Sequence, residues 1–258
     1  MQDVAILKNV AKDNLKALCL CALLLFSGFW LTAQNDEPEK IKVDYDKIEK
    51  FVKKNEDDFE ALMARFVAGD TTLSTKEMAN LYYGTYFSPK YSYLDASKEM
   101  RDAYGQGDAK KGYQIGKEEL KKSPTSLGLL LLTSNCAAAL KLQDEAKNLD
   151  LRVSQILDVI FASGDGQTCG TAWKVLEVSD EYIIIYGVFG AKSKSQALVH
   201  DDGHSCDKMT VFTDDPNDTI DIYFDITLHM KKLNEMFNID TPKDDKPKKQ
   251  GKKKKMNQ

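Results

Sequence analysis

Two of the three histidines in this chain of 258 residues lie close to a cysteine, in the segment His200-Asp201-Asp202-Gly203-His204-Ser205-Cys206. The Asp-Gly pair is typical of a tight β-hairpin, which would bring His200 and His204 together with Cys206 nearby. Imidazole and thiolate are the ligands that zinc prefers. The segment therefore predicts a metal site formed by His200, His204 and Cys206. The alternative is an ordinary turn, because Asp, Gly and Ser collect in turns for conformational reasons and the spacing matches no standard zinc pattern.

The same segment also suggests nucleophilic catalysis. Cys206 or Cys169, activated by His200, would make a hydrolase or a thiol enzyme. The sequence contains no Walker loop, dinucleotide fingerprint, HExxH or GxSxG motif, and no cofactor is expected. A structural role for the cysteines stays open. Cys169 and Cys206 flank the predicted sheet and could pair, whereas Cys136 lies in an apolar helical run and is expected to be buried.

A cluster of tyrosines forms a second candidate site. Tyr82, Tyr83, Tyr86 and Tyr91 lie within ten residues of one another, and aromatic side chains of this kind can line a groove for a sugar or a peptide, because each supplies contact area and a hydroxyl group. At helical spacing the same residues can instead pack between helices. Both interpretations remain open from the sequence.

The elements that would position these residues fall into two halves. Residues 44–162 show helical periodicity, with a capping-box pattern at Ser74–Glu77 and a helix-ending glycine at Gly69. Helices are expected near residues 48–52, 59–67, 75–87, 95–104, 108–120, 127–140 and 144–160. Residues 105–162 are typical of a tetratricopeptide-like hairpin, whose groove could bind a peptide; plain helical packing is the alternative.

A change of periodicity follows the breaker Ser163-Gly164-Asp165-Gly166. Strands are expected at residues 171–178, 182–189, 197–200, 209–212 and 220–226, the second of them central because it is apolar throughout. The last of these strands alternates apolar residues with Asp221, Tyr223 and Asp225, which predicts a wet, acidic face. A closing helix is expected at 227–238. Helices followed by an antiparallel meander give an α+β fold, as a single domain over 44–240 with the sheet within 169–226.

Three blocks in this order resemble a known family. They are Phe66-Val67-Ala68-Gly69-Asp70-Thr71-Thr72-Leu73 with Leu81-Tyr82-Tyr83-Gly84-Thr85-Tyr86-Phe87; Ser163-Gly164-Asp165-Gly166 with Thr171-Ala172-Trp173 and Val178-Ser179-Asp180-Glu181-Tyr182; and Ile222-Tyr223-Phe224-Asp225-Ile226. Together they resemble the exported Bacteroidetes proteins catalogued as domain of unknown function 4919. The resemblance covers about residues 42–230 and implies export, but no reaction, cofactor or catalytic residue.

Both ends of the chain differ from this body. In residues 1–33 a segment with three lysines is followed by an apolar run at 17–31. This pattern predicts a secretory signal peptide cleaved after Ala33; an uncleaved anchor is the alternative. Residues 34–43 are expected to be a linker. Residues 241–258 form a lysine-rich tail expected to be disordered, in which Lys243–Lys255 could contact an anionic surface.

The distribution of charge along the chain limits the classes of molecule that the protein is expected to bind. The net charge of −4 hides an acidic body, with 25 basic and 36 acidic residues between positions 34 and 242. An acidic body argues against a sequence-specific nucleic-acid groove, and after signal cleavage no transmembrane span is expected. The sequence therefore predicts a periplasmic or extracellular, non-catalytic binding protein whose partner is another envelope protein or a peptide. The alternative is an enzyme centred on the His200–Cys206 hairpin.

Overall fold

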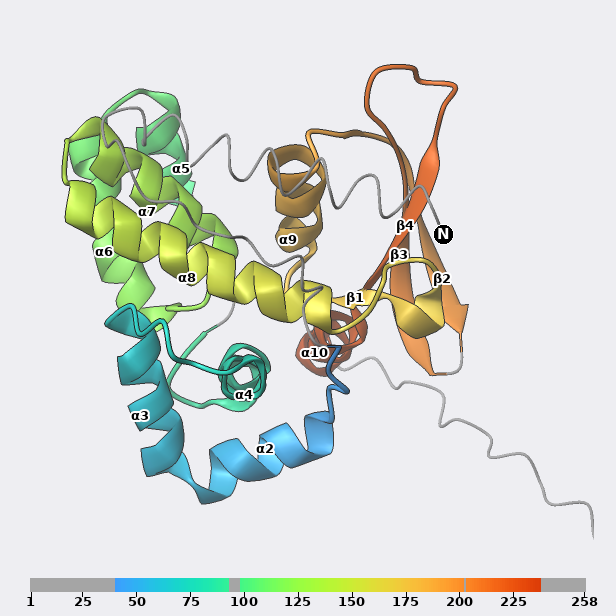
Figure 1. Ribbon diagram of the computed structural model, residues 1–258, viewed down its shortest axis with the longest axis horizontal. Helices are drawn as coiled ribbons and strands as arrows, with labels where there is room; N and C mark the ends of the chain where they lie inside the picture. Colours follow the sequence, from blue (N-terminus) through green and yellow to red (C-terminus); the bar gives the residue numbers. More distant parts are fainter. Residues whose placement is uncertain (1–39, 93–97, 202, 238–258) are drawn as a thin grey trace, which may run out of the picture.

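The computed structural model describes residues 40–92, 98–201 and 203–237, and places a helical half beside a β-sheet (Figure 1). The predicted signal peptide and lysine-rich tail lie outside the described residues. The helical half consists of α2 (Tyr45–Lys54), α3 (Glu56–Val67), α4 (Thr75–Phe87), α5 (Lys98–Gly105), α6 (Ala109–Lys122), α7 (Leu127–Ala139) and α8 (Gln143–Ala162). These positions confirm the helical periodicity read from the sequence. Among the described residues, no helix has the length and apolar character needed to cross a bilayer.

Local signals at the helix ends also behave as expected. The Ser74 side chain accepts from the backbone of Glu77, and the Glu77 carboxylate accepts from the backbone of Ser74, so the capping box that opens α4 is confirmed. Gly69 has φ +77° just beyond α3, and a Cβ there would lie 2.5 Å from Nδ2 of Asn148. Glycine suits this position because any other side chain would be strained by this φ and would also displace the Asn148 side chain.

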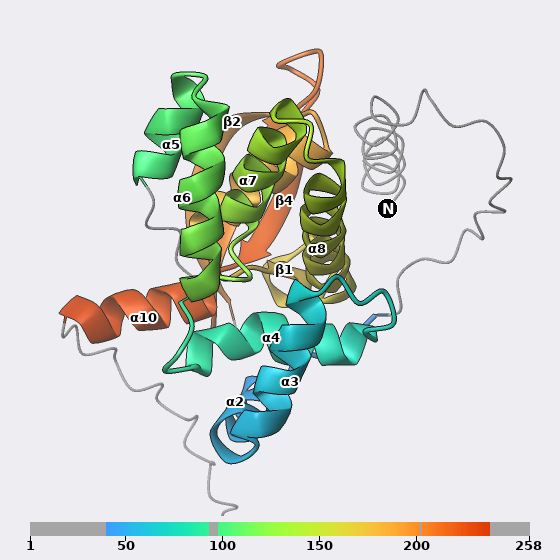
Figure 2. The ribbon, with the colours of Figure 1, turned by 90° about the vertical axis from the view of Figure 1, so that its left-hand side faces the viewer.

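Helices α6, α7 and α8 pack side by side in succession (Figure 2). Helix α6 approaches α7 closely at Gly116, where a Cβ would lie 2.1 Å from Oγ1 of Thr133. Pro124 and the Ser126 cap separate the two helices. The result is the helical hairpin that the sequence predicted; its likeness to a tetratricopeptide unit remains a prediction.

In the described part of the chain the sheet has four strands in the order β1-β4-β3-β2: β1 (Trp173–Lys174), β2 (Lys192–Asp201), β3 (His204–Phe212) and β4 (Ile220–Asp225). Strands β2, β3 and β4 are antiparallel, but β1 runs parallel to β4. The fold is α+β, as predicted, although the expected antiparallel meander is a mixed sheet. The closing helix α10 (Thr227–Phe237) follows β4 and is also confirmed.

Two predicted strands are wrong. Of residues 171–178 only β1 is a strand, and it follows the 3-10 turn η1 (Cys169–Thr171). Residues 182–188 are helical, in α9 (Val178–Tyr182) and the π-helical η2 (Ile183–Val188). Glu177 and Asp180 form a capping box that begins α9. In the apolar run the buried positions are 184, 185, 188 and 189, and the more exposed ones are 182, 183, 186 and 187. This spacing has a helical period. Because nearly all residues of the run are apolar, the sequence did not show which of them are buried, and so did not distinguish a helix from a strand.

A shared aromatic core joins the two halves. The Trp173 ring of β1 lies 5.1 Å from Phe161 at the end of α8, 5.7 Å from Phe189 and 5.9 Å from Phe224 of β4, centroid to centroid. Helix α8 thus ends at the sheet, as Figure 1 shows. One continuous core therefore fixes the helical half against the strands.

Candidate functional site

A groove of about 640 Å³ is lined by residues of α3, α6 and α8. Figure 1 shows where these three helices lie. This volume falls within the range of ligand pockets in proteins. Its lining residues come from α3, the segment after α4, α6, the α6–α7 connection and α8: Met63, Val67, Tyr91, Lys117, Leu120, Lys121, Pro124, Asp144, Glu145, Asn148, Leu149 and Arg152. Three helices and two connecting segments thus build one concave site.

The groove has an apolar floor and a charged rim. Met63, Leu120 and Leu149 form buried parts of the floor, while Val67 remains 45% exposed. The Lys117 ammonium lies 3.5 Å from a Glu145 carboxylate oxygen across the rim. An apolar floor bordered by a few polar groups is the usual composition of a ligand site.

Arg152 is the unusual residue of this groove. It is 4% exposed and lies on α8, with Nη2 donating to the Pro124 carbonyl at 2.7 Å and Cζ 4.8 Å from the centroid of the Phe66 ring. Its buried Nε has no acceptor among the described residues. Burial lowers the pKa of Arg152 to about 10. A buried cation without an anion is costly, so this guanidinium favours an acceptor supplied from outside.

Helix α8 also holds the loop that follows α3. Gln155 donates to the Asp70 carbonyl at 2.7 Å, and Asn148 donates to the Val67 carbonyl at 3.3 Å. These bonds fix the end of α3, and with it Val67, against the groove. The groove wall is therefore positioned by contacts that are distant in sequence.

The predicted tyrosine site is not assembled. Tyr82 and Tyr83 are buried, and their hydroxyl groups donate to Asp180 and to the Lys174 carbonyl, at 2.9 and 3.1 Å. These two side chains pack α4 against β1 and α9, so the ligand-binding prediction is wrong for them. Tyr86 is half-buried and packs against Phe87. Among the four tyrosines Tyr91 lines the groove, with its hydroxyl donating to Glu60 at 2.7 Å.

The predicted metal site is wrong as well. Cys206 forms a disulfide with Cys169, so its thiolate is not available to a metal or as a nucleophile. Asp201 pairs with His204 and His200 with Ser205 across the hairpin, which puts His200 and His204 on opposite faces because side chains alternate along a strand. Among the described residues no group of three His, Cys, Asp or Glu side chains is placed to hold a metal ion. Cys136 is buried, as expected.

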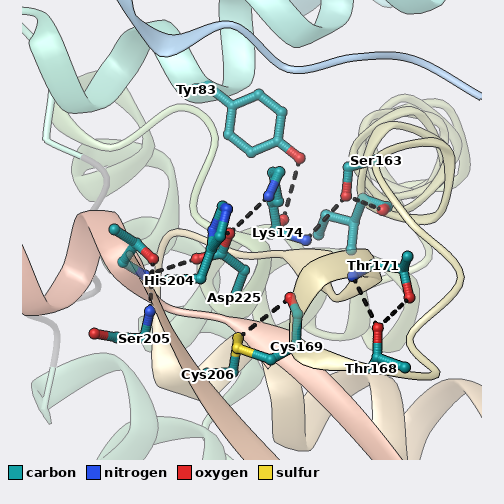
Figure 3. A network of polar contacts seen from close by, with 12 residues as sticks. Tyr83, Ser163, Thr168, Cys169, Thr171, Lys174, His204, Ser205, Cys206 and Asp225 are labelled. Carbon is teal, nitrogen blue, oxygen red and sulfur yellow. Dashed lines mark hydrogen bonds and ion pairs between the residues drawn. A yellow bond between two sulfur atoms is a disulfide. The ribbon is translucent and has the colours of Figure 1, made fainter. Parts of the chain in front are cut away.

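His204 instead joins an ionic cluster around Asp225 (Figure 3). The Asp225 Oδ2 accepts from Lys174 Nζ at 2.6 Å and lies 2.9 Å from His204 Nδ1, and its Oδ1 accepts from the Thr227 backbone at 2.9 Å. Burial opposes ionisation, but the Lys174 ammonium and the hydrogen bonds hold the pKa of Asp225 below its usual value. Asp225 is 1% exposed, so the acidic face predicted for β4 is dry at this position. The cluster ties β1, β3, β4 and α10 together.

The Cys169–Cys206 disulfide fastens η1 to β3 beneath this cluster (Figure 3). We expect the double substitution Cys169→Ser/Cys206→Ser to lower the free energy of unfolding by about 2–4 kcal/mol, because the bond restricts the unfolded chain over 37 residues. Urea unfolding followed by circular dichroism measures this. A reductant should destabilise the wild type and leave the double variant unchanged; equal responses would contradict the bond.

A second buried cluster lies between α9, β3 and α10. Glu181 is fully buried, and neither of its carboxyl oxygens receives a hydrogen bond from the described residues. Burial, followed by the neighbouring Asp207 and Asp180, raises the pKa of Glu181 to about 10, so its carboxyl group stays protonated at neutral pH. Burial also lowers the pKa of His229, which lies near Asp207. This cluster is closed to ligands and affects stability.

Sequence reasoning missed Arg152 although a signal was present. The apolar face of α8 carries Leu149, Val153 and Ile156. Arg152 lies three positions after Leu149 and four before Ile156, so a basic residue interrupts an apolar helical face. A basic residue at such a position indicates a buried cation.

Comparison with known protein families gives a match over most of the chain. The family model described as Domain of unknown function (DUF4919) matches residues 46–235. No curated protein and no solved structure matches the chain.

Proposed function

The chain belongs to the family described as Domain of unknown function (DUF4919), and we propose that it is an exported, non-catalytic binding protein. The groove between α3, α6 and α8 holds a peptide segment of an envelope partner. The observation that carries this proposal is the groove itself, an apolar concavity of about 640 Å³ with a charged rim and a buried guanidinium whose Nε has no acceptor among the described residues.

Export is supported by two features of the chain. The apolar run at residues 17–31 after three lysines is typical of a secretory leader. The Cys169–Cys206 disulfide suits an oxidising compartment, where such bonds form and persist. An envelope location would bring the groove together with exported partner proteins, and the lysine-rich tail would add contact with an anionic surface.

Filling the groove tests this proposal. Val67 is a partly exposed groove residue at the end of α3, so Val67→Trp should cover the floor without disturbing the core. We expect the wild-type protein, expressed from its complete sequence, to retain a subset of a random pool of N-acetylated, C-amidated peptides. Val67→Trp should lower this retention by about tenfold or more, since truncating or blocking a central contact costs 1.4 kcal/mol or more. Mass spectrometry of the eluted peptides measures the retention.

A matched control is available on the sheet. Leu198 in β2 has a similar exposed fraction, 49% against 45% for Val67, and lies outside the groove. Leu198→Trp should retain the same peptides as the wild type. If the wild type retains no peptide above the level of Val67→Trp, or if both tryptophan variants lose binding equally, the groove is not the binding site.

A further inference from the structure

Arg152 has the geometry of a recognition residue. It lies on the floor of the groove, 4% exposed, with one guanidinium nitrogen on the Pro124 carbonyl and Nε buried without an acceptor among the described residues. A guanidinium presents its donors as a planar fork that fits a carboxylate. The structure therefore holds a prepared donor for which the described part of the chain provides no anion.

The two lysines of the groove are paired with carboxylates of the protein. Lys117 pairs with Glu145 at 3.5 Å, and Lys121 pairs with Glu118 at 2.7 Å. Asp144 adds a further negative charge to the rim. These exposed pairs are weak and screened by salt. A preference for an anion in this groove therefore has to come from Arg152.

The depth of Arg152 indicates which kind of carboxylate reaches it. Val67, Lys117 and Lys121 are exposed at the rim, whereas Arg152 lies among buried floor residues such as Leu149. A peptide backbone that passes over the rim can extend a side chain downward to the floor. A chain terminus would have to bring its polar backbone into the apolar floor, which is costly.

We propose that Arg152 selects peptides in which an acidic side chain is flanked by apolar residues. The carboxylate accepts hydrogen bonds from the Arg152 guanidinium, and the apolar neighbours cover Met63, Val67 and Leu120. This inference rests on the proposed peptide groove and names its specificity.

Three pools of short, N-acetylated peptides test the proposal on the full-length protein. The first contains Asp and Glu at random positions and is C-amidated. The second is identical except that Asn and Gln replace the acids. The third has the composition of the second but free C-terminal carboxylates. We expect the wild type to retain the first pool about tenfold more strongly than the second and third, because charge-assisted hydrogen bonds are about twice as strong as neutral ones.

Two substitutions connect the preference to Arg152. Arg152→Met keeps an apolar stem of similar length among the buried floor residues, so we expect the fold to be kept. It should retain the first and second pools equally. Arg152→Lys keeps the charge and should recover part of the preference, and thermal unfolding checks that both variants are folded.

Failure of the inference differs from failure of the groove. Retention of the first and second pools to the same extent by the wild type, stronger retention of the third pool, or an undiminished acidic preference in Arg152→Met would overturn the role of Arg152 while leaving a peptide groove in place. Retention of no pool above the Val67→Trp background would instead overturn the proposed function itself.

Discussion

Asp225→Asn is expected to lower the free energy of unfolding by about 3–5 kcal/mol, the cost of removing one partner from a buried ion pair. The Asp225 carboxylate is 1% exposed and accepts from Lys174 Nζ at 2.6 Å, with the His204 ring at 2.9 Å. Asparagine has the same shape but no charge, so the Lys174 ammonium would remain in its site without a counter-ion. Urea unfolding of the wild type and the variant measures the loss.

A matched control lies on the same strand. Asp221 pairs with Lys208 at 2.7 Å, but both side chains are at least one-third exposed, so Asp221→Asn should cost no more than about 1 kcal/mol. Lys174→Met combined with Asp225→Asn should recover part of the stability, because the unpaired cation is then absent. Equal losses for Asp221→Asn and Asp225→Asn would contradict the importance of the buried cluster.

The stabilisation that the Lys174–Asp225 pair provides should depend on pH. The pKa of Asp225 is lowered in the folded state, so its contribution is present above the usual carboxyl pKa near 3.8 and is lost as the pH falls below that value. The stability difference between the wild type and Asp225→Asn should therefore shrink in acid. This separates the loss of charge from a general loss of packing.

Glu181→Gln is expected to stabilise the protein increasingly as the pH rises. The pKa of Glu181 is raised to about 10, whereas in the unfolded chain it ionises near 4.5. Between these values the folded state holds one more proton than the unfolded state, so wild-type stability falls by about 1.4 kcal/mol per pH unit through this group. Between pH 5 and pH 8 the difference between Glu181→Gln and the wild type should therefore grow by about 4 kcal/mol. Unfolding in urea at a series of pH values measures it.

The stability difference between Glu181→Gln and the wild type reports the titration of Glu181 separately from that of its neighbours. Both proteins carry His229, Asp180 and Asp207, so titration of these groups largely cancels. Glutamine is uncharged and has nearly the same shape as the protonated carboxyl, so the substitution should leave the packing around this position unchanged. Glu118→Gln on the surface should give a flat difference over this range, because its pKa is lowered by Lys121. A flat difference for Glu181→Gln would show that its carboxyl is ionised in the fold.

Much of the fold was predictable because its signals are local. The capping box at Ser74 and Glu77, the positive φ of Gly69, and the helical periodicity of α2 to α8 depend on residues within a few positions of one another. The hairpin of β2 and β3 follows from alternation around Gly203, whose φ is +80°. Backbone conformation within a turn of helix or a hairpin is decided by neighbouring residues.

The candidate sites were less predictable because they depend on register and on distant partners. Their residue types alone predicted that His200, His204 and Cys206 form one site. The strand register places the two imidazoles on opposite faces of the hairpin, and Cys206 is bonded to Cys169 in a disulfide. The run 182–189 was uniformly apolar, so only its packing partners selected a helix over a strand.

The sequence by itself determined the helical order, the hairpin, the closing helix and the family of this chain, because short-range signals and the order of characteristic blocks define them. Only the tertiary structure decided which charges are paired. Lys174 pairs with Asp225, which lies 51 residues later in the sequence, whereas Arg152 is buried without a carboxylate among the described residues. The energy of a buried charge depends on the groups that the fold brings around it, and those groups come from segments distant in sequence.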